Sequence, residues 1–485
     1  MNRLSGWTMK NQQFQYTDKD GDTIVAISTP PGIGGIGIVR LSGPRSIEIA
    51  SKIFRYKGNK RKNLEEFHSH RIYYGTIVAP GKDTMADEVL LTVMRKPESY
   101  TREDVVEINC HGGYLAINKV LEIVQNMGAR IAEPGEFTKL AFLNGRIDLS
   151  QAEAVIDIIK ASNEKSWHSS LRHLSGDLRT EINNLKNRII DINARIEAVL
   201  DFPDQGLPEI DHKEITSTLK KALSEISELL NTVKYGQLIK EGINAIILGK
   251  TNVGKSSLFN ILLKQNKSIV TPLPGTTRDL IEGFINIKGL TFNLIDTAGM
   301  KSPENIIEKI SLERVDQQME YARLFLVMFD ISEPLDANDI KLIEKVRSFH
   351  NRNNFKIIIL NKTDLPARLD EVELQQRIGE KEFIKISIKK KTGIDTLTEK
   401  MSSKVLSDLY IPEEGLVISN KRHQESLLNI KNCLVNLITG LEKSVPIDLV
   451  SLDLKYIINQ LGKITGESYD EEMLNHIFSQ FCIGK

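Results

Sequence analysis

The sequence predicts a multidomain protein with an α+β N-terminal domain, an all-α helical domain made from two separate segments, and an α/β domain inserted between those segments. Glycine turns separate β-type runs near the N-terminus, and residues 148–200 and 214–233 then follow helical periodicity. An apolar strand pattern with a glycine loop starts at residue 243, and helical periodicity returns at 420–443 and 449–464. Helices on both sides of a compact α/β unit indicate an insertion, because such domains have neighbouring termini.

These patterns also predict where each part of the chain begins and ends. We expect a disordered leader at 1–21, an N-terminal domain at 22–144, the two helical segments at 145–240 and 408–485, and the inserted domain at 241–407. The leader is polar and has no apolar signal-peptide core, and Met9 is an alternative start. We also expect Ser150 and Glu153 to form a capping box at the start of the first helix.

Composition excludes several classes of protein. The chain has 485 residues with 40% hydrophobic content, which suits packed cores, and no apolar run is long enough to predict a membrane span. The 64 basic and 64 acidic residues balance, so net charge does not indicate nucleic-acid binding. Cys110, Cys433 and Cys482 are too scattered for a disulfide framework, which favours a cytoplasmic location. Cys110 adjoins His111, but no second pair stands at metal-ligand spacing.

The stretch INAIILGKTNVGKSSLFN, at 243–260, predicts a phosphate-binding loop between a strand and a helix. Gly249 and Gly254 bracket four residues, and Lys255 and Ser256 follow at once, which is the G-x-x-x-x-G-K-[ST] spacing. The glycines let backbone N–H groups face phosphate oxygens, Lys255 adds positive charge, and the Ser256 hydroxyl is suited to ligate Mg²⁺. The alternative is a glycine turn before an ordinary helix, which the full pattern disfavours.

Downstream motifs indicate guanine as the base. TFNLIDTAG is an apolar strand that ends in Asp296, placed to hold the Mg²⁺ shell, and Gly299 can offer a backbone N–H to the γ-phosphate. KIIILNKTD brings Asn361 and Asp364, whose carboxylate can accept two N–H bonds from guanine. Residues 387–389 end a further strand and are expected to back the base. The order and separation of these motifs predict GTP binding.

The sequence also contains several longer distinctive stretches, which are TPPGIGGIGIVRLSG, SYTREDVVEINCHGG, PGEFTKLAFLNGRIDLSQAEAV, GTTRD and the terminal FCIGK. Together they resemble the MnmE (TrmE) family of bacterial GTPases, which act in modification of the tRNA wobble uridine. The resemblance implies a homodimer whose N-terminal domain binds folate and dimerises, a helical domain from two chain segments, and a Ras-like P-loop G domain. It also implies that the chain acts together with the flavoprotein MnmG (GidA), in a heterotetramer or larger complex. The implied reaction adds an aminomethyl-type group to carbon 5 of tRNA uridine 34, with the carbon from a 5-formyl- or methylene-tetrahydrofolate.

The resemblance and the motifs together assign binding residues. Predicted GTP contacts are Asn252, Val253, Gly254, Lys255, Ser256, Ser257, Thr271, Pro272, Leu273, Pro274, Gly275, Thr276, Thr277, Asp296, Thr297, Ala298, Gly299, Asn361, Lys362, Thr363, Asp364, Ser387, Ile388 and Lys389. Mg²⁺ is expected on Ser256 and Thr277. The family's folate contacts fall on Arg40, Glu107, Arg146 and Lys485. The family's C-terminal cysteine falls on Cys482, which either takes part in the modification chemistry or is a small apolar residue of a terminal helix.

Two features of the sequence predict that the charge and the water of the transition state are handled differently from Ras-type enzymes. Met300 stands where those enzymes place a water-orienting glutamine, and the phosphate loop contains no arginine. The resemblance implies that Glu308 replaces the glutamine. A K⁺ ion could balance the charge that develops between the β and γ phosphates, since hard cations take neutral oxygens. Its predicted ligands are Asn252, Thr271, Leu273 and Thr276, and the alternative for Asn252 is that it only caps the loop.

Two classes of function fit these motifs. The first is a K⁺-stimulated GTP hydrolase that drives tRNA modification through dimerisation of its G domains. The second is a GTPase switch in ribosome assembly or at a membrane. The sequence favours the first, because ribosome-assembly relatives usually carry a second G domain, or an RNA-binding module with a GxxG loop after the first G domain, and neither pattern follows the G domain here.

Overall fold

The computed structural model describes residues 22–56, 60–61, 63–81, 84–202, 204, 211–265, 281–296, 319–348, 354–407, 409–412, 415–443 and 445–485. The chain divides into two compact units. One contains the described residues up to Ile156 together with Thr465–Lys485, and the other is Asp157–Ile464. The boundaries expected from the sequence at 144/145, 240/241 and 407/408 stay predictions.

The first unit is built on a seven-stranded sheet in the order β3-β4-β5-β6-β2-β1-β7. Only β1 and β7 pair in parallel, and the other neighbours are antiparallel. The strands are β1 (Ile24–Ile27), β2 (Ile36–Ser42), β3 (Phe54–Arg55), β4 (Arg71–Val78), β5 (Met85–Met94), β6 (Val105–His111) and β7 (Arg130–Ile131). The helices are α1 (Ser46–Ile53), the 3-10 turn η2 (Leu64–Glu66), α2 (Tyr114–Asn126), α3 (Glu136–Leu143) and α16 (Glu471–Ser479). Alternating apolar residues of β2, β5 and β6 pack against α1 and α2.

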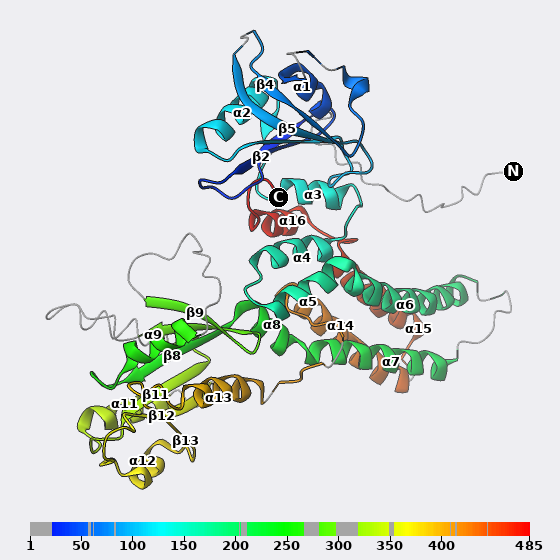
Figure 1. Ribbon diagram of the computed structural model, residues 1–485. Coiled ribbons are helices and arrows are strands. Elements are labelled where there is room, and N and C mark those ends of the chain that lie inside the picture. Colours follow the sequence, from blue (N-terminus) through cyan, green and yellow to red (C-terminus); the bar gives the residue numbers. More distant parts are fainter. Residues whose placement is uncertain are drawn as a thin grey trace. The chain divides into compact units, whose positions relative to one another are not determined.

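The C-terminal segment joins this unit although it is far away in sequence. Figure 1 shows α16, drawn in red, beside α3, and the apolar face of α16 packs on α3 and α4. Beyond α16, Ile483 forms a β-bridge with Pro134. The last residues of the chain therefore lie against the β-sheet domain, at the start of α3.

The helical part has long helices where periodicity predicted them. They are α4 (Leu149–Lys160), α5 (Glu164–Ser175), α6 (Asp177–Asp201), α7 (His212–Asn231), α8 (Val233–Glu241), α14 (Lys421–Glu442) and α15 (Ile447–Thr465). The predicted capping box is wrong by two residues. Asp148 Oδ1 accepts from the Gln151 N–H at 2.8 Å, and Gln151 Oε1 accepts from the Asp148 N–H at 3.0 Å. Ser150 lies inside α4 and instead donates its hydroxyl to Asp148 Oδ1, since an ionised carboxylate two residues earlier can accept this bond as well as that from the Gln151 N–H.

The inserted α/β part contains a six-stranded sheet in the order β13-β12-β11-β8-β10-β9. All neighbours are parallel except β9 and β10. The strands are β8 (Ile243–Gly249), β9 (Ile281–Ile287), β10 (Leu290–Asp296), β11 (Leu324–Asp330), β12 (Phe355–Asn361) and β13 (Phe383–Lys385). The helices are α9 (Lys255–Gln265), α11 (Ala337–Ser348), α12 (Glu371–Ile378) and α13 (Ile394–Leu406).

Helices cover both faces of this second sheet, as the near-continuous apolar runs of its parallel strands require. One face packs on α8, α9 and α13, and the other packs on α11 and α12. Because β8 lies between β10 and β11, the loop after β8 sits where the strand order reverses, which is where such sheets bind ligands. The predicted fold class is confirmed. Within the described segments, no helix is long and apolar enough to cross a membrane.

Candidate functional site

The phosphate loop has the backbone geometry that its glycines predicted. Gly249 and Gly254 have φ values of +157° and +111°, and a Cβ at Gly254 would lie 2.6 Å from Asn361 Nδ2. Asn252 is also left-handed, with φ of 62°. Lys255 begins α9, and its Nζ donates to the carbonyl oxygens of Gly249 and Lys250 at 2.8 and 2.9 Å. The loop thus carries a lysine ammonium and a helix N-terminus at one place, which suits phosphate.

Asn361 connects the phosphate loop to the predicted base pocket. It ends β12, and its Nδ2 donates to the Val253 carbonyl oxygen at 2.7 Å. Its Oδ1 accepts from the Ile388 N–H at 3.3 Å, on the segment expected to back the base. Asn361 is 3% exposed, and its bond to the Val253 carbonyl oxygen is buried, whereas the bond from the Ile388 N–H is partly buried. The amide therefore holds three sequence motifs together.

The predicted base reader, Asp364, lies next to the same segment. Its Oδ1 accepts from the Ser387 hydroxyl at 2.6 Å, and this hydrogen bond holds the pKa of the Asp364 carboxyl below its ordinary value. The Thr363 N–H donates to the Ile386 carbonyl oxygen at 3.2 Å. An ionised carboxylate with an unused oxygen can accept N–H bonds, which is what reading guanine requires.

The residues expected at Mg²⁺ lie at neighbouring strand ends. Asp296 ends β10 and is 2% exposed, and Ser256 is in the first turn of α9. Asp296 stands opposite Ile247 of β8, two residues before the loop begins. In the described part of the chain, no group of three His, Cys, Asp or Glu residues could hold a metal ion. A carboxylate and a hydroxyl still fit Mg²⁺, because this ion keeps several waters and takes phosphate oxygens as ligands.

Part of the predicted site lies outside the described residues. This applies to the loop expected to bind K⁺ and Mg²⁺, to the end of the DTAG motif, and to the proposed catalytic glutamate. These residues are Thr271, Pro272, Leu273, Pro274, Gly275, Thr276, Thr277, Thr297, Ala298, Gly299, Met300 and Glu308.

The residues expected at folate gather around the end of the chain, in the first unit. The register of β2 and β6 puts Arg40 opposite Glu107, and Arg40 Nε lies 2.8 Å from Glu107 Oε1. Arg40 Nη1 donates to the Gly484 carbonyl oxygen at 3.3 Å, as does the Ser28 hydroxyl at 3.1 Å. Gly484 has φ of +92°, and a Cβ there would lie 2.4 Å from a carbonyl oxygen of β1. The C-terminal tail is thus held close to Arg40.

Aromatic rings complete this cluster. The Arg146 guanidinium lies 4.8 Å from the centre of the Tyr100 ring, and the Arg40 guanidinium lies 5.7 Å from that of Phe137. Arg146 is exposed and has no carboxylate partner among the described residues, so its charge is available to an anion. Lys485, which follows Gly484, is half-buried.

The cysteines differ in exposure. Cys482 is exposed, and its carbonyl oxygen accepts from the Gly135 N–H at 3.4 Å. Cys110 is buried, its thiol donates to the Gly37 carbonyl oxygen, and burial raises its pKa to about 11. The neighbouring His111 contacts Asp87, with its Nδ1 2.7 Å from Asp87 Oδ1, and within the described residues neither Cys110 nor His111 belongs to a group that could hold a metal ion.

Comparisons with known proteins assign the family. Residues 23–146 match the family described as the GTP-binding protein TrmE N-terminus, and residues 149–482 match the MnmE helical domain. The chain belongs to the MnmE family of tRNA modification GTPases.

Its similarity to curated MnmE proteins extends over nearly the whole chain. The tRNA modification GTPase MnmE of Thermoanaerobacter pseudethanolicus is 44% identical over 465 residues, which cover 96% of this chain and 99% of the relative. The tRNA modification GTPase MnmE of Lactiplantibacillus plantarum is 43% identical over 471 residues, which cover 97% of this chain and 100% of the relative. Among solved structures, the G domain of the T. maritima FeoB iron transporter aligns with 33% of this chain and 98% of its own, at 26% identity and a TM-score of 0.27.

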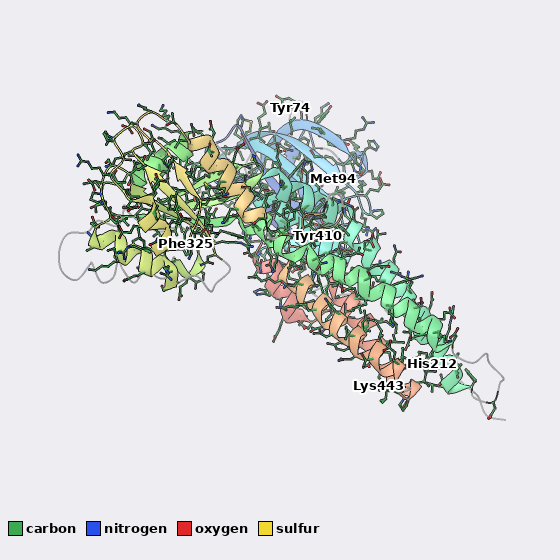
Figure 2. The ribbon with its side chains drawn as sticks, turned by 90° about the horizontal axis from the view of Figure 1, so that it is seen from below. Tyr74, Met94, His212, Phe325, Tyr410 and Lys443 are labelled. Atoms are coloured by element: carbon green, nitrogen blue, oxygen red, sulfur yellow. The ribbon has the colours of Figure 1, made fainter. Side chains whose placement is uncertain are left out.

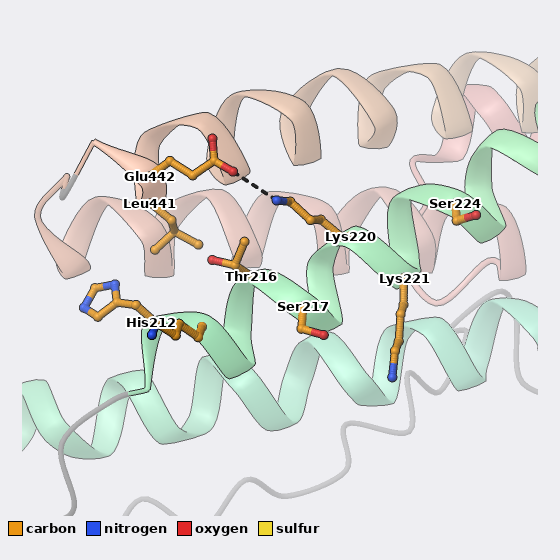
Figure 3. Close-up of a pocket in the computed structure, with 9 residues that line it drawn as sticks. His212, Thr216, Ser217, Lys220, Lys221, Ser224, Leu441 and Glu442 are labelled. Carbon is orange, nitrogen blue, oxygen red and sulfur yellow. Dashed lines mark hydrogen bonds and ion pairs between the residues drawn. The ribbon is translucent and has the colours of Figure 1, made fainter.

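A groove of about 660 Å³ lies on the helical part of this MnmE family member, at the start of α7 and the end of α14 (Figure 3). Figure 2 shows His212 and Lys443 at this end of the two helices. Lys220 crosses the groove to Glu442 at 3.0 Å. None of the residues predicted from the sequence lies there, and the residues that line the groove are His212, Lys213, Thr216, Ser217, Lys220, Lys221, Ser224, Leu441 and Glu442.

Sequence reasoning did not single out two charged groups beside the nucleotide motifs. Lys250, inside the phosphate loop, contacts three carboxylates. Asp330 is at the end of β11, and its Oδ2 lies 2.5 Å from Lys362 Nζ. The available signal was the density of acidic residues in DISEPLDAND, directly after a wholly buried strand.

Proposed function

We propose that this chain is a K⁺-stimulated GTP hydrolase that acts with MnmG to modify carbon 5 of the wobble uridine of certain tRNAs, using a folate-derived carbon. The observation that carries the nucleotide part is the double hydrogen bond of Asn361, which joins the phosphate loop to the base pocket in a member of the tRNA modification GTPase family. Hydrolysis is proposed to drive dimerisation of the G domains within a homodimer.

Each nucleotide residue then has a separate task. Lys255 and the N-terminus of α9 bind the phosphates, Asp364 selects guanine, and Ser256 with Thr277 holds Mg²⁺, which supplies charge neutralisation at the phosphates when it is bound. Glu308 is proposed to orient the attacking water. Thr277→Ala should retain GDP binding and lose hydrolysis, since its hydroxyl is needed only in the triphosphate state.

The K⁺ proposal rests on Asn252. Its carboxamide bonds to none of the described residues, so the alternative that it only caps the loop has no hydrogen bond to support it. The carboxamide oxygen is therefore available as a ligand, with Thr271, Leu273 and Thr276 as the other proposed ligands.

The test is GTP hydrolysis in K⁺ and in Na⁺ at equal ionic strength. We expect hydrolysis to be much faster in K⁺, and Asn252→Ala to lose this response while it still binds GDP. For comparison, an arginine finger raises the rate of GTP hydrolysis roughly 10³- to 10⁵-fold. Equal rates in the two salts for the wild-type protein would rule out this mechanism.

The folate proposal rests on the charges around the chain end. The second carboxylate oxygen of Glu107 is not used by Arg40, and it can accept from the N–H edge of a pterin. Arg146 can hold an anionic tail, and Lys485 is proposed as a second positive charge for the same ligand. Arg146→Ala should weaken tetrahydrofolate binding by about 1.5–3 kcal/mol, the scale of a charged hydrogen bond. Arg71→Ala, which removes an exposed arginine of the same unit, is the matched control in calorimetry.

The reaction itself is tested in cells. Nucleoside analysis of tRNA from a deletion strain should show unmodified wobble uridine, and expression of the wild-type chain should restore the modification. Unchanged wobble uridine in the deletion strain would favour the second candidate, a GTPase switch in ribosome assembly or at a membrane. Cys482→Ser in the same assay separates a role in the modification chemistry from a packing role, because only the first requires the thiol.

A further inference from the structure

The segment that follows β11 lies between the two loops that are predicted to hold the nucleotide. In the sheet, β11 has β8 on one side and β12 on the other. The phosphate loop follows β8, and the NKTD motif begins at the end of β12. Because the carboxyl ends of parallel strands meet at one edge of the sheet, residues 330–339 stand between both loops.

This segment, which we call the acidic segment, contacts the phosphate loop through one lysine. Lys250 Nζ lies 3.0 Å from Glu333 Oε2 and 3.2 Å from both Asp336 Oδ2 and Asp339 Oδ2. The Lys250 side chain is only 13% exposed, and that of Asp339 is 3% exposed. Burial by itself lowers the pKa of Lys250, but the three carboxylates outweigh this effect and raise the pKa above its ordinary value. Lys250 is therefore a charged lysine held at one place.

The same lysine connects to the group that must bind phosphate. The carbonyl oxygen of Lys250 accepts from Lys255 Nζ at 2.9 Å. Asp336 directly precedes α11, and its Oδ1 accepts from the N–H groups of Asn338 and Asp339 at 2.8 and 3.0 Å. A continuous path of contacts thus leads from the N-terminus of α11, through Lys250, to the Lys255 ammonium.

The other end of the acidic segment contacts the loop after β12, which carries Lys362 and the predicted base reader Asp364 and is called the base-reading loop here. Asp330 Oδ2 lies 2.5 Å from Lys362 Nζ, and Asp330 Oδ1 accepts from the N–H and the hydroxyl of Ser332 at 2.9 and 2.7 Å. Lys362 has a left-handed backbone, with φ of 66°, which this contact helps to hold. The Ile331 N–H also donates to the Asn361 carbonyl oxygen at 3.0 Å.

We propose that the acidic segment is a positioning element for nucleotide binding, which orders the phosphate loop through Lys250 and the base-reading loop through Lys362. This inference rests on the proposed function, because it assumes that GTP and GDP bind at these two loops. None of its carboxylates needs to touch the nucleotide. Their effect is to reduce the freedom of two lysine-bearing loops before the nucleotide arrives, which lowers the ordering cost of binding.

The decisive variants change Lys250. Lys250→Met removes the ammonium and leaves three carboxylates, one of them buried, beside the phosphate loop. We expect GDP affinity, measured by titration with a fluorescent GDP analogue, to fall about tenfold or more, a change of about 1.4 kcal/mol or more, because the nucleotide must then order the loop itself against the added negative charge. Lys250→Arg should restore most of the affinity, and adding Asp339→Asn to Lys250→Met should recover part of it.

One control and one further variant test whether Lys250 acts by positioning the two loops or by stabilising the fold. Lys385→Met removes an exposed lysine that pairs with Glu371 at 2.8 Å in the same domain, and it should leave GDP affinity unchanged. Asp330→Asn tests the other end of the segment and should weaken GDP several-fold while it keeps its bonds to Ser332. If Lys250→Met does not fold, Glu333→Gln is the substitute. This substitution removes one ion pair of Lys250 with little change in packing, because the Glu333 side chain is half-exposed.

The possible outcomes are distinct. Weaker GDP binding by folded Lys250→Met and Asp330→Asn proteins, with the affinity restored in Lys250→Arg, supports the proposal. Wild-type GDP affinity in a folded Lys250→Met protein, or in Glu333→Gln where that substitute is used, overturns it. No GDP binding by the wild-type chain would instead refute the proposed function.

Discussion

Replacement of Asn361 by alanine tests whether one amide joins the nucleotide motifs. Asn361→Ala leaves the Val253 carbonyl oxygen without its donor, in a residue that is 1% exposed. An unsatisfied buried acceptor costs about 1–3 kcal/mol, and loss of the longer bond to the Ile388 N–H adds about 0.5 kcal/mol. We therefore expect the free energy of unfolding of the G domain to fall by about 1.5–3.5 kcal/mol. GDP affinity should fall as well, by at most about 300-fold, the factor that corresponds to the upper end of this range.

The assay is urea denaturation with and without saturating GDP, together with a GDP titration. Asn293→Ala is the matched control, since its Nδ2 donates to Asn244 Oδ1 at 2.9 Å near the opposite end of β8. The control should lose stability but keep GDP affinity. Equal loss of GDP affinity in both variants, or unchanged stability of Asn361→Ala, would refute the assignment of Asn361 as the link between motifs.

Further predictions concern the first unit. Gly484→Ala should detach the C-terminal tail and weaken folate binding, because its Cβ would lie 2.4 Å from a β1 carbonyl oxygen; limited proteolysis of the C-terminus reports the detachment. Cys482 should react with a thiol reagent at pH 8 much faster than Cys110, whose pKa burial raises to about 11. The hydrogen bond to Asp87 raises the pKa of His111, so the stabilisation it provides is fully present below about pH 6.5 and is lost as pH rises through the raised pKa. His111→Gln should remove this pH dependence from denaturation curves, and an unchanged profile would contradict it.

Local patterns in the sequence were sufficient to predict the phosphate loop and the long helices. The phosphate loop could be predicted because its glycines, lysine and serine are adjacent in the chain and act within one strand, loop and helix. The long helices followed from apolar spacing, which depends on neighbours one turn away. The capping box at α4 was misplaced, because several polar residues stand close together there and only their geometry selects Asp148 and Gln151.

Contacts between distant segments were decided only by the tertiary structure. The Ser28 hydroxyl meets the Gly484 carbonyl oxygen across 456 positions, and the Arg40 and Glu107 pair depends on the register of two strands. Lys250 obtains its carboxylates from a segment more than eighty positions later, because β11 enters the sheet beside β8. Chain order does not specify such neighbours. They follow from strand order, register and packing, which the whole domain determines together, whereas the chemistry of each loop is already present in its own few residues.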